Sequence, residues 1–156
     1  MTRFAALLLA AACVAVPLAA RAENPNACDL ITIDEVNTFA SGVATKISQR
    51  QSGNPSQCAF EDARRGAVLV ITVREVQYAA ENELQYEREN LEKIYRSKVK
   101  YVKPLGDGDG AFWFGANKTA MFRKAKRIVT VSFAREKNAV ETDTVQMARL
   151  IDAHLK

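Results

Sequence analysis

The strongest pattern along the chain is an apolar run, residues 66–75, that leads into a long amphipathic segment, residues 76–97. Residues 68–73 are apolar or β-branched on both alternating faces, which predicts a central strand covered on both sides. In the second segment apolar residues recur at about 100° per residue, which predicts a helix that lies on the sheet. Its apolar stripe contains Val76, Ala80, Leu84, Leu91, Ile94 and Tyr95.

One acidic residue, Glu87, projects into the middle of this stripe. We interpret its side chain as one that reaches solvent or pairs with a nearby arginine. A buried carboxylate with a functional role is the alternative interpretation.

A helix and two strands are predicted before residue 66. Thr32 and Glu35 have the T-x-x-E spacing of a capping box, so a short helix begins after Thr32, with Gly42 as a natural stop. Its inward residues are Ile33, Val36 and Phe39. Residues 43–50 and 57–62 are predicted to form two strands, joined by a turn that contains Gly53, Asn54 and Pro55.

The second half of the sequence predicts four strands and a last helix. Residues 98–103 alternate Lys with Val and Tyr, as an edge strand does. Residues 106–115 form a glycine-rich loop that leads into an aromatic strand, and residues 119–124 and 127–133 form a hairpin. Residues 142–155 are amphipathic and predict a helix. The order α-β-β-β-α-β-β-β-β-α indicates an α+β domain with a mainly antiparallel sheet and flanking helices.

The first 22 residues have the features of a bacterial signal peptide. A basic start precedes an apolar run at residues 4–17, and Ala20, Arg21 and Ala22 match a small-x-small cleavage site. Cleavage leaves residues 23–156 as one domain, periplasmic or secreted, without a segment of the roughly 20 apolar residues that span a membrane. The disfavoured alternative is a lipid-anchored protein attached at Cys13, whose preceding residues faintly match a lipobox.

The predicted export determines the expected oxidation state of the cysteines, because oxidising compartments favour disulfide bonds. Once Cys13 is removed, Cys28 and Cys58 remain as an even pair, and we predict a structural disulfide between them. The loop that it closes has 31 residues. Such a loop corresponds to roughly 3–4 kcal/mol of stabilisation in the chain-entropy account. A redox-active pair would more often have the close C-x-x-C spacing.

Several short motifs resemble a group of small exported bacterial domains, often lipoproteins, of unknown function. They are CDLIT with Glu35 and Val36, Cys58 with the aromatic Phe60, and GDG before Ala111, Phe112 and Trp113. The group is similar in architecture to the PsbP-like α/β sandwich. The resemblance implies this fold and the disulfide, and it offers no catalytic residues to carry over.

No catalytic, metal or cofactor site is predicted. The only histidine, His154, lies near the chain end on an amphipathic helix, where packing or helix capping explains it. One histidine and an oxidised cysteine pair cannot supply the three or four ligands of a zinc site. The GDGDG stretch lacks the remaining ligands of an EF-hand and the Lys of a Walker loop. We therefore expect a non-enzymatic protein and interpret this stretch as a glycine turn with solvated Asp107 and Asp109, with weak cation binding as the alternative.

Three consecutive aromatic residues, Phe112, Trp113 and Phe114, point to alternate faces of their strand. If helices cover both faces of the sheet, all three belong to the core. If one face is open, Trp113 lies in a binding patch.

Charge is unevenly distributed along the chain. Residues 23–92 contain 6 basic and 12 acidic residues, whereas residues 93–135 contain 11 basic and 2 acidic ones. The basic residues considered as a candidate site, together with Trp113, are Lys98, Lys100, Lys103, Lys118, Arg123, Lys124, Lys126 and Arg127. They either form one basic edge, since strands close in sequence usually neighbour in space, or a solvated face that acidic residues neutralise.

These features favour a non-enzymatic periplasmic binding or interaction module. Its basic surface would meet an anionic envelope component or an acidic protein, and export disfavours nucleic acid as the partner. The alternative is an envelope structural or accessory protein that acts through protein–protein contacts, in which the charge is incidental.

Overall fold

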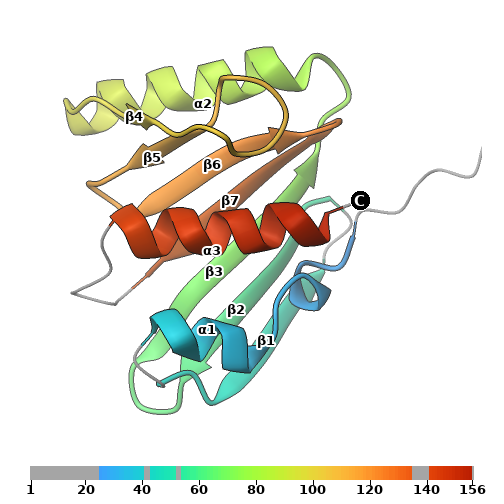
Figure 1. The fold of residues 1–156 in the computed structure, drawn as a ribbon, viewed down its shortest axis with the longest axis vertical. Coiled ribbons are helices and arrows are strands. Elements are labelled where there is room, and N and C mark those ends of the chain that lie inside the picture. Colours follow the sequence, from blue (N-terminus) through green and yellow to red (C-terminus); the bar gives the residue numbers. More distant parts are fainter. Residues whose placement is uncertain (1–24, 41–42, 52–53, 135–140, 156) are drawn as a thin grey trace, which may run out of the picture.

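A computed structural model describes residues 25–40, 43–51, 54–134 and 141–155. They form one seven-stranded sheet with helices on both faces (Figure 1). The elements are η1 (Ala27–Asp29), α1 (Ile33–Phe39), β1 (Lys46–Gln51), β2 (Ser56–Asp62), β3 (Gly66–Glu75), α2 (Ala80–Tyr95), β4 (Lys100–Tyr101), β5 (Phe112–Phe114), β6 (Thr119–Lys124), β7 (Arg127–Phe133) and α3 (Glu141–His154).

The strand order is β1-β2-β3-β7-β6-β5-β4, and every neighbouring pair is antiparallel. The sheet therefore consists of two meanders, β1 to β3 and β4 to β7, joined where β3 pairs with β7. Helix α2 connects the two meanders in the chain. The α+β class and the order of the elements are both confirmed.

The two faces of the sheet bury different sets of apolar side chains. Helices α1 and α3, together with η1, cover the main core, to which alternate residues of β3, β6 and β7 contribute. Helix α2 packs on the opposite face, mainly on β6 and β7, over a smaller core that includes Phe112, Phe114 and Met121. Alternation along the strands produces this division, because successive side chains point to opposite faces. The predicted inward residues of the last helix, Met147, Ala148, Ile151 and Leu155, are buried.

The predicted disulfide is present and attaches the N-terminal part of the domain to the sheet. Cys28 and Cys58 form a disulfide that joins η1 to β2, and the adjacent Ala27 N–H donates to the hydroxyl of the buried Ser56 at 2.9 Å. The Thr32 and Glu35 capping box begins α1, whose Val36 is fully buried. The expected stop at Gly42 lies outside the described residues.

Helix α2 begins four residues later than its apolar pattern predicts. The Val76 N–H donates to the carbonyl of Lys126 at 2.9 Å, so the chain still follows the sheet at this point. At the other end, Ile94 and Tyr95 are exposed, although they belong to the predicted stripe. The pairing interpretation of Glu87 is confirmed, because its carboxylate accepts from the Arg74 guanidinium at 3.1 Å.

Strand β3 is covered more fully on one face than on the other. Leu69, Ile71 and Val73 are fully buried on the α3 side, whereas Val70 and Thr72 are only half-buried. The expectation that both faces are covered is therefore wrong at these two positions, because α2 packs mainly on β6 and β7.

The predicted signal peptide lies outside the described residues, as does Cys13. Among the residues that the structure describes, none of the helices is long and apolar enough to span a membrane.

Candidate functional site

The predicted basic residues do not share one face of the sheet. Lys100 and Lys124 lie on the α3 side and pair with Glu141 and Asp152 of that helix, with Nζ–O distances of 2.7 and 2.9 Å. Arg123 precedes Lys124 in β6 and therefore points to the α2 side. Lys118 and Lys126 lie in the turns at opposite ends of β6.

Half of these side chains form ion pairs with carboxylates. Besides Lys100 and Lys124, Lys98 pairs with Glu92 at 3.0 Å and Lys103 pairs with Asp109 at 2.8 Å. The hydrogen bond that Lys124 donates to the Asp152 carboxylate is the main cause of the raised pKa of Lys124. Part of the positive charge of residues 93–135 is thus balanced by carboxylates close to it in space.

Trp113 lies on the α3 side of β5 and packs against the main core, half-buried. Phe112 and Phe114 are fully buried on the α2 side. Because helices cover both faces here, the three aromatic residues belong to the core, and Trp113 does not lie in an open patch. Arg127, at the start of β7, is half-buried.

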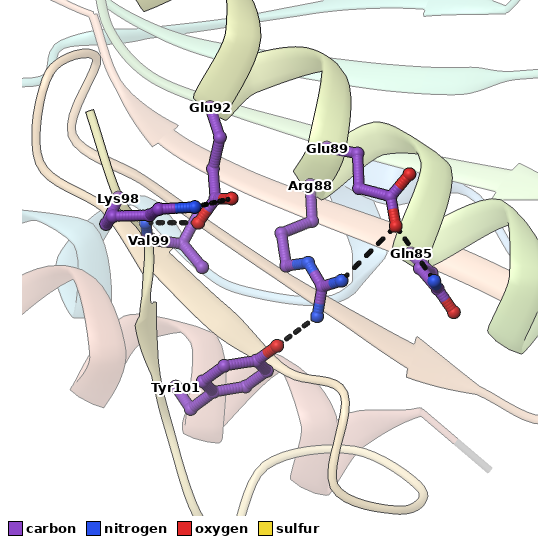
Figure 2. Close-up of polar contacts among 7 residues, drawn as sticks. All are labelled: Gln85, Arg88, Glu89, Glu92, Lys98, Val99 and Tyr101. Carbon is purple, nitrogen blue, oxygen red and sulfur yellow. Dashed lines mark hydrogen bonds and ion pairs between the residues drawn. The ribbon is translucent and has the colours of Figure 1, made fainter. Parts of the chain in front are cut away.

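Helix α2 is attached to the segment before β4 by a row of polar contacts (Figure 2). The carboxylate of Glu92 accepts from Lys98 and from the Val99 N–H, and these hydrogen bonds, Lys98 first, lower the pKa of Glu92. One turn earlier, Arg88 extends toward β4, where its guanidinium donates to the hydroxyl of Tyr101 and lies 5.6 Å from the ring centroid.

The Arg88 guanidinium is also tied to its own helix. It lies 3.5 Å from the carboxylate of Glu89, which in turn accepts from the Gln85 side-chain amide at 2.8 Å. These contacts orient Arg88 and Gln85 on the face of α2 that looks toward β4 (Figure 2).

The glycine-rich loop folds back against the end of β6. The Gly106 N–H donates to the Asp152 carboxylate at 2.9 Å, and the Asp107 N–H donates to the Arg123 carbonyl at 2.7 Å. The Asp107 carboxylate accepts from the Ala125 N–H at 2.6 Å and so supports the β6–β7 turn. Asp107 is therefore a structural residue, and Asp109 is largely exposed.

A pocket of about 240 Å³ opens between α2, β4, the glycine loop and β6. It contains both arginines that face this space, Arg88 and Arg123, together with the Tyr101 ring and the apolar side chain of Leu84. The complete lining is Glu81, Leu84, Gln85, Arg88, Tyr101, Asp107, Gly108, Asp109, Gly110 and Arg123.

Most charges in this lining already have partners. Arg88 contacts Tyr101 and Glu89, Asp107 accepts from Ala125, and Asp109 pairs with Lys103. Arg123 differs, because within the described ranges no carboxylate lies within ion-pair distance of its guanidinium. The residue as a whole is half-buried. Glu81, in the first turn of α2, is likewise unpaired in the part of the chain that the structure describes.

Of the pocket's residues, sequence reasoning identified Arg123 and the two Asp residues but missed Glu81, Gln85, Arg88 and Tyr101. The three α2 residues recur at i, i+4 and i+7, which is the signal of a shared helix face. This signal alone does not identify a site, because nothing in the spacing shows that residues 101–110 fold over this helix face. Tyr101 was assigned only to an edge strand.

Among the described residues, the other side chains considered for catalysis or metal binding either make structural contacts or do not cluster. The His154 Nδ1 lies 2.7 Å from the carbonyl oxygen of Leu30, which ties the end of α3 to the N-terminal segment. Across the described residues, no cluster of three or more His, Cys, Asp or Glu side chains has metal-binding geometry.

Comparison of the chain with protein-family models found no match, and neither did comparison with the sequences of curated proteins.

Proposed function

We propose that this protein is a non-enzymatic binding module of the bacterial cell envelope, exported from the cytoplasm, that recognises an anionic group of an envelope partner. The pocket between α2 and the glycine loop is the proposed binding site. Arg123 is the residue that receives the anion, and Arg88 and Tyr101 form the opposite wall.

The observation that carries this proposal is the unpaired Arg123 guanidinium in a concave site. A guanidinium presents several donors in a fixed planar arrangement that matches carboxylate or phosphate oxygens. Partial burial also strengthens its attraction for an anion, because the effective dielectric constant is lower than in bulk water. The other basic residues of the predicted patch contribute less, since four of them already pair with carboxylates.

The disulfide supports the proposed location. Cys28 and Cys58 are joined in the folded domain, and structural disulfides persist in oxidising compartments such as the bacterial periplasm. Lipid A, anionic phospholipid headgroups, acidic polymers and acidic proteins are the anionic partners available there.

The test is an amide NMR titration of the oxidised protein with lipid A, anionic phospholipid and a polyanion, each at low and at physiological salt. We expect salt-sensitive shifts in residues 106–110 and around Arg123, because exposed charge pairs weaken as ionic strength rises. Arg123→Gln should remove these shifts. Lys126→Gln is the matched control: it removes the same charge from the neighbouring turn but does not line the pocket. Equal effects of the two variants, or no shifts with any anion, would contradict the proposal.

A second candidate is an accessory protein that acts through contacts of α2 with another protein. It is favoured by the large apolar and aromatic side chains exposed on and beside this helix: Tyr78, Tyr86, Ile94 and Tyr95. Binding through such a surface would persist at high salt, because apolar burial does not depend on charge attraction. Loss of binding in an Ile94→Asp variant, with Arg123→Gln unaffected, would favour this candidate.

A further inference from the structure

The pocket that contains Arg123 also contains an unpaired charge of the opposite sign. Glu81 lies on the α2 wall, whereas Arg123 belongs to β6 on another side of the same pocket. Among the described residues, neither side chain has an ionic partner. A ligand that satisfies both must carry one negative and one positive group.

The remaining charges of the lining do not alter this balance. Asp107 is held by the Ala125 N–H and Lys124, Asp109 by Lys103, and Arg88 by Tyr101 and Glu89. Such groups lose existing contacts if they turn toward a ligand, whereas Arg123 and Glu81 lose none. The pocket therefore offers one available cation and one available anion.

The size and the apolar part of the pocket limit the ligand further. A volume of about 240 Å³ corresponds to roughly eight water molecules at about 30 Å³ each. A pocket of this size accommodates a small molecule. The apolar surface of the pocket comes mainly from the Tyr101 ring, which is half exposed, because Leu84 is almost completely buried. Gly110 packs on Leu84 so closely that an added Cβ would lie 3.3 Å from Leu84 Cδ2.

The geometry points to an α-amino acid with an apolar side chain, bound as its zwitterion, as the ligand of this pocket. Its carboxylate binds Arg123, its ammonium group binds Glu81, and its side chain packs on the exposed Tyr101 ring. This inference rests on the proposed function, because it uses the same arginine for the anionic group, and it adds the ammonium contact and the apolar contact.

Leucine is the probe, and two derivatives remove its charges one at a time. N-acetylleucine lacks the ammonium group and leucinamide lacks the carboxylate. We expect saturable amide NMR shifts in residues 81–88 and 106–110 with leucine. Each derivative should bind at least about tenfold more weakly, because each loses a charge-assisted hydrogen bond.

Variants of the protein assign each contact to its residue. Glu81→Gln should weaken leucine binding but leave N-acetylleucine binding unchanged, because that ligand has no ammonium group to lose. Arg123→Gln should weaken both, and Arg123→Lys should retain part of the affinity, since it keeps the charge but loses the planar donors. Lys126→Gln should bind leucine as the unmodified protein does. Dispersed amide spectra confirm that each variant is folded.

The outcomes separate this inference from the proposed function. Equal binding of N-acetylleucine and leucine would overturn the inference but leave an anion site at Arg123. Binding of leucinamide as tight as that of leucine, unaffected by Arg123→Gln, would overturn both. Binding of O-phosphoethanolamine without binding of leucine would overturn the assignment to an amino acid, and so would the absence of binding by leucine.

Discussion

Gly106 holds the glycine loop in a conformation that other residues adopt with strain. Its φ is +63°, and a Cβ at this position would clash with the Arg123 carbonyl and lie 2.8 Å from Phe122 Cδ2. The backbone around it also bonds to Asp152 and Arg123, so the loop cannot move away without losing these contacts. We predict that Gly106→Ala lowers the free energy of unfolding by roughly 2–4 kcal/mol, measured by urea denaturation.

Gly110 provides the comparison for this prediction. It has no left-handed φ, and an added Cβ would meet only the end of the Leu84 side chain, at 3.3 Å. Gly110→Ala should therefore cost less than about 1 kcal/mol. Equal losses from the two variants would show that the loop tolerates a side chain at Gly106.

The arginine site shows what residue identity alone can indicate. Arg123 was selected from the sequence because it belongs to a basic segment, but seven other basic residues were selected with it. Their ion pairs distinguish these residues as anion-binding candidates. Lys100 and Lys124 pair with carboxylates of α3, whereas Arg123 faces the other side of the sheet. Such pairing joins residues far apart in the chain, up to 41 positions in the case of Lys100 and Glu141, so local spacing does not reveal it.

At the scale of single elements, the start of α1 depends on the reciprocal contacts of Thr32 and Glu35. The Glu35 N–H donates to the Thr32 hydroxyl at 3.2 Å, and the Glu35 carboxylate accepts from the Thr32 N–H at 2.8 Å. We predict that Thr32→Ala costs about 1 kcal/mol of unfolding free energy at neutral pH.

The same box makes α1 sensitive to acid. The hydrogen bond from the Thr32 N–H is the main cause of a lowered pKa at Glu35. A lowered pKa in the folded state gives stability that is present above the ordinary glutamate pKa and is lost as pH falls through the folded value. Urea denaturation of the protein and of Glu35→Gln should therefore show a difference that shrinks below about pH 4.5. The comparison isolates Glu35, because the two proteins share every other side chain; a constant difference would contradict the prediction.

Periodicity predicted the elements well and their ends less well. The hairpin of β6 and β7 has the predicted bounds, because its alternation and its two-residue turn at Ala125 and Lys126 are local. Helix α2 starts later than its pattern suggests, since the Val76 N–H is taken by Lys126, which is distant in sequence. The edge strand β4 is reduced to Lys100 and Tyr101, because it pairs with only Trp113 and Phe112 of β5.

At the scale of the whole molecule, the pocket arises from tertiary arrangement. The sequence shows a polar helix face and a glycine loop, but only the fold brings residues 107–110 opposite Glu81 and Arg88. The crossing of α2 from β3 to β4 produces this arrangement, since it returns the chain to the far edge of the sheet, beside the helix itself (Figure 1). The types of residue in the candidate site could thus be predicted from the sequence, but their arrangement in space could not.

The disulfide acts on the whole domain, because it links η1 to β2 across 30 positions of the chain. Closing such a loop restricts the unfolded chain, and we predict that breaking it lowers the free energy of unfolding by roughly 3–4 kcal/mol. Urea denaturation of the oxidised protein with and without reductant measures this effect on the same sequence. The Cys28→Ala, Cys58→Ala double variant should lose somewhat more, because Cys58 is fully buried and a smaller side chain leaves a cavity.

Reductant should not alter the double variant, which serves as the control for direct effects of the reductant. Unchanged stability of the native sequence on reduction would show that packing of Ala27 and Val36 alone holds the N-terminal segment on the sheet. The predicted loss instead makes the oxidised state a condition for a fully stable N-terminal layer, because the disulfide adds to the packing of the buried Ala27 and Val36 on the sheet. A protein that depends in this way on its disulfide reaches its full stability in an oxidising compartment.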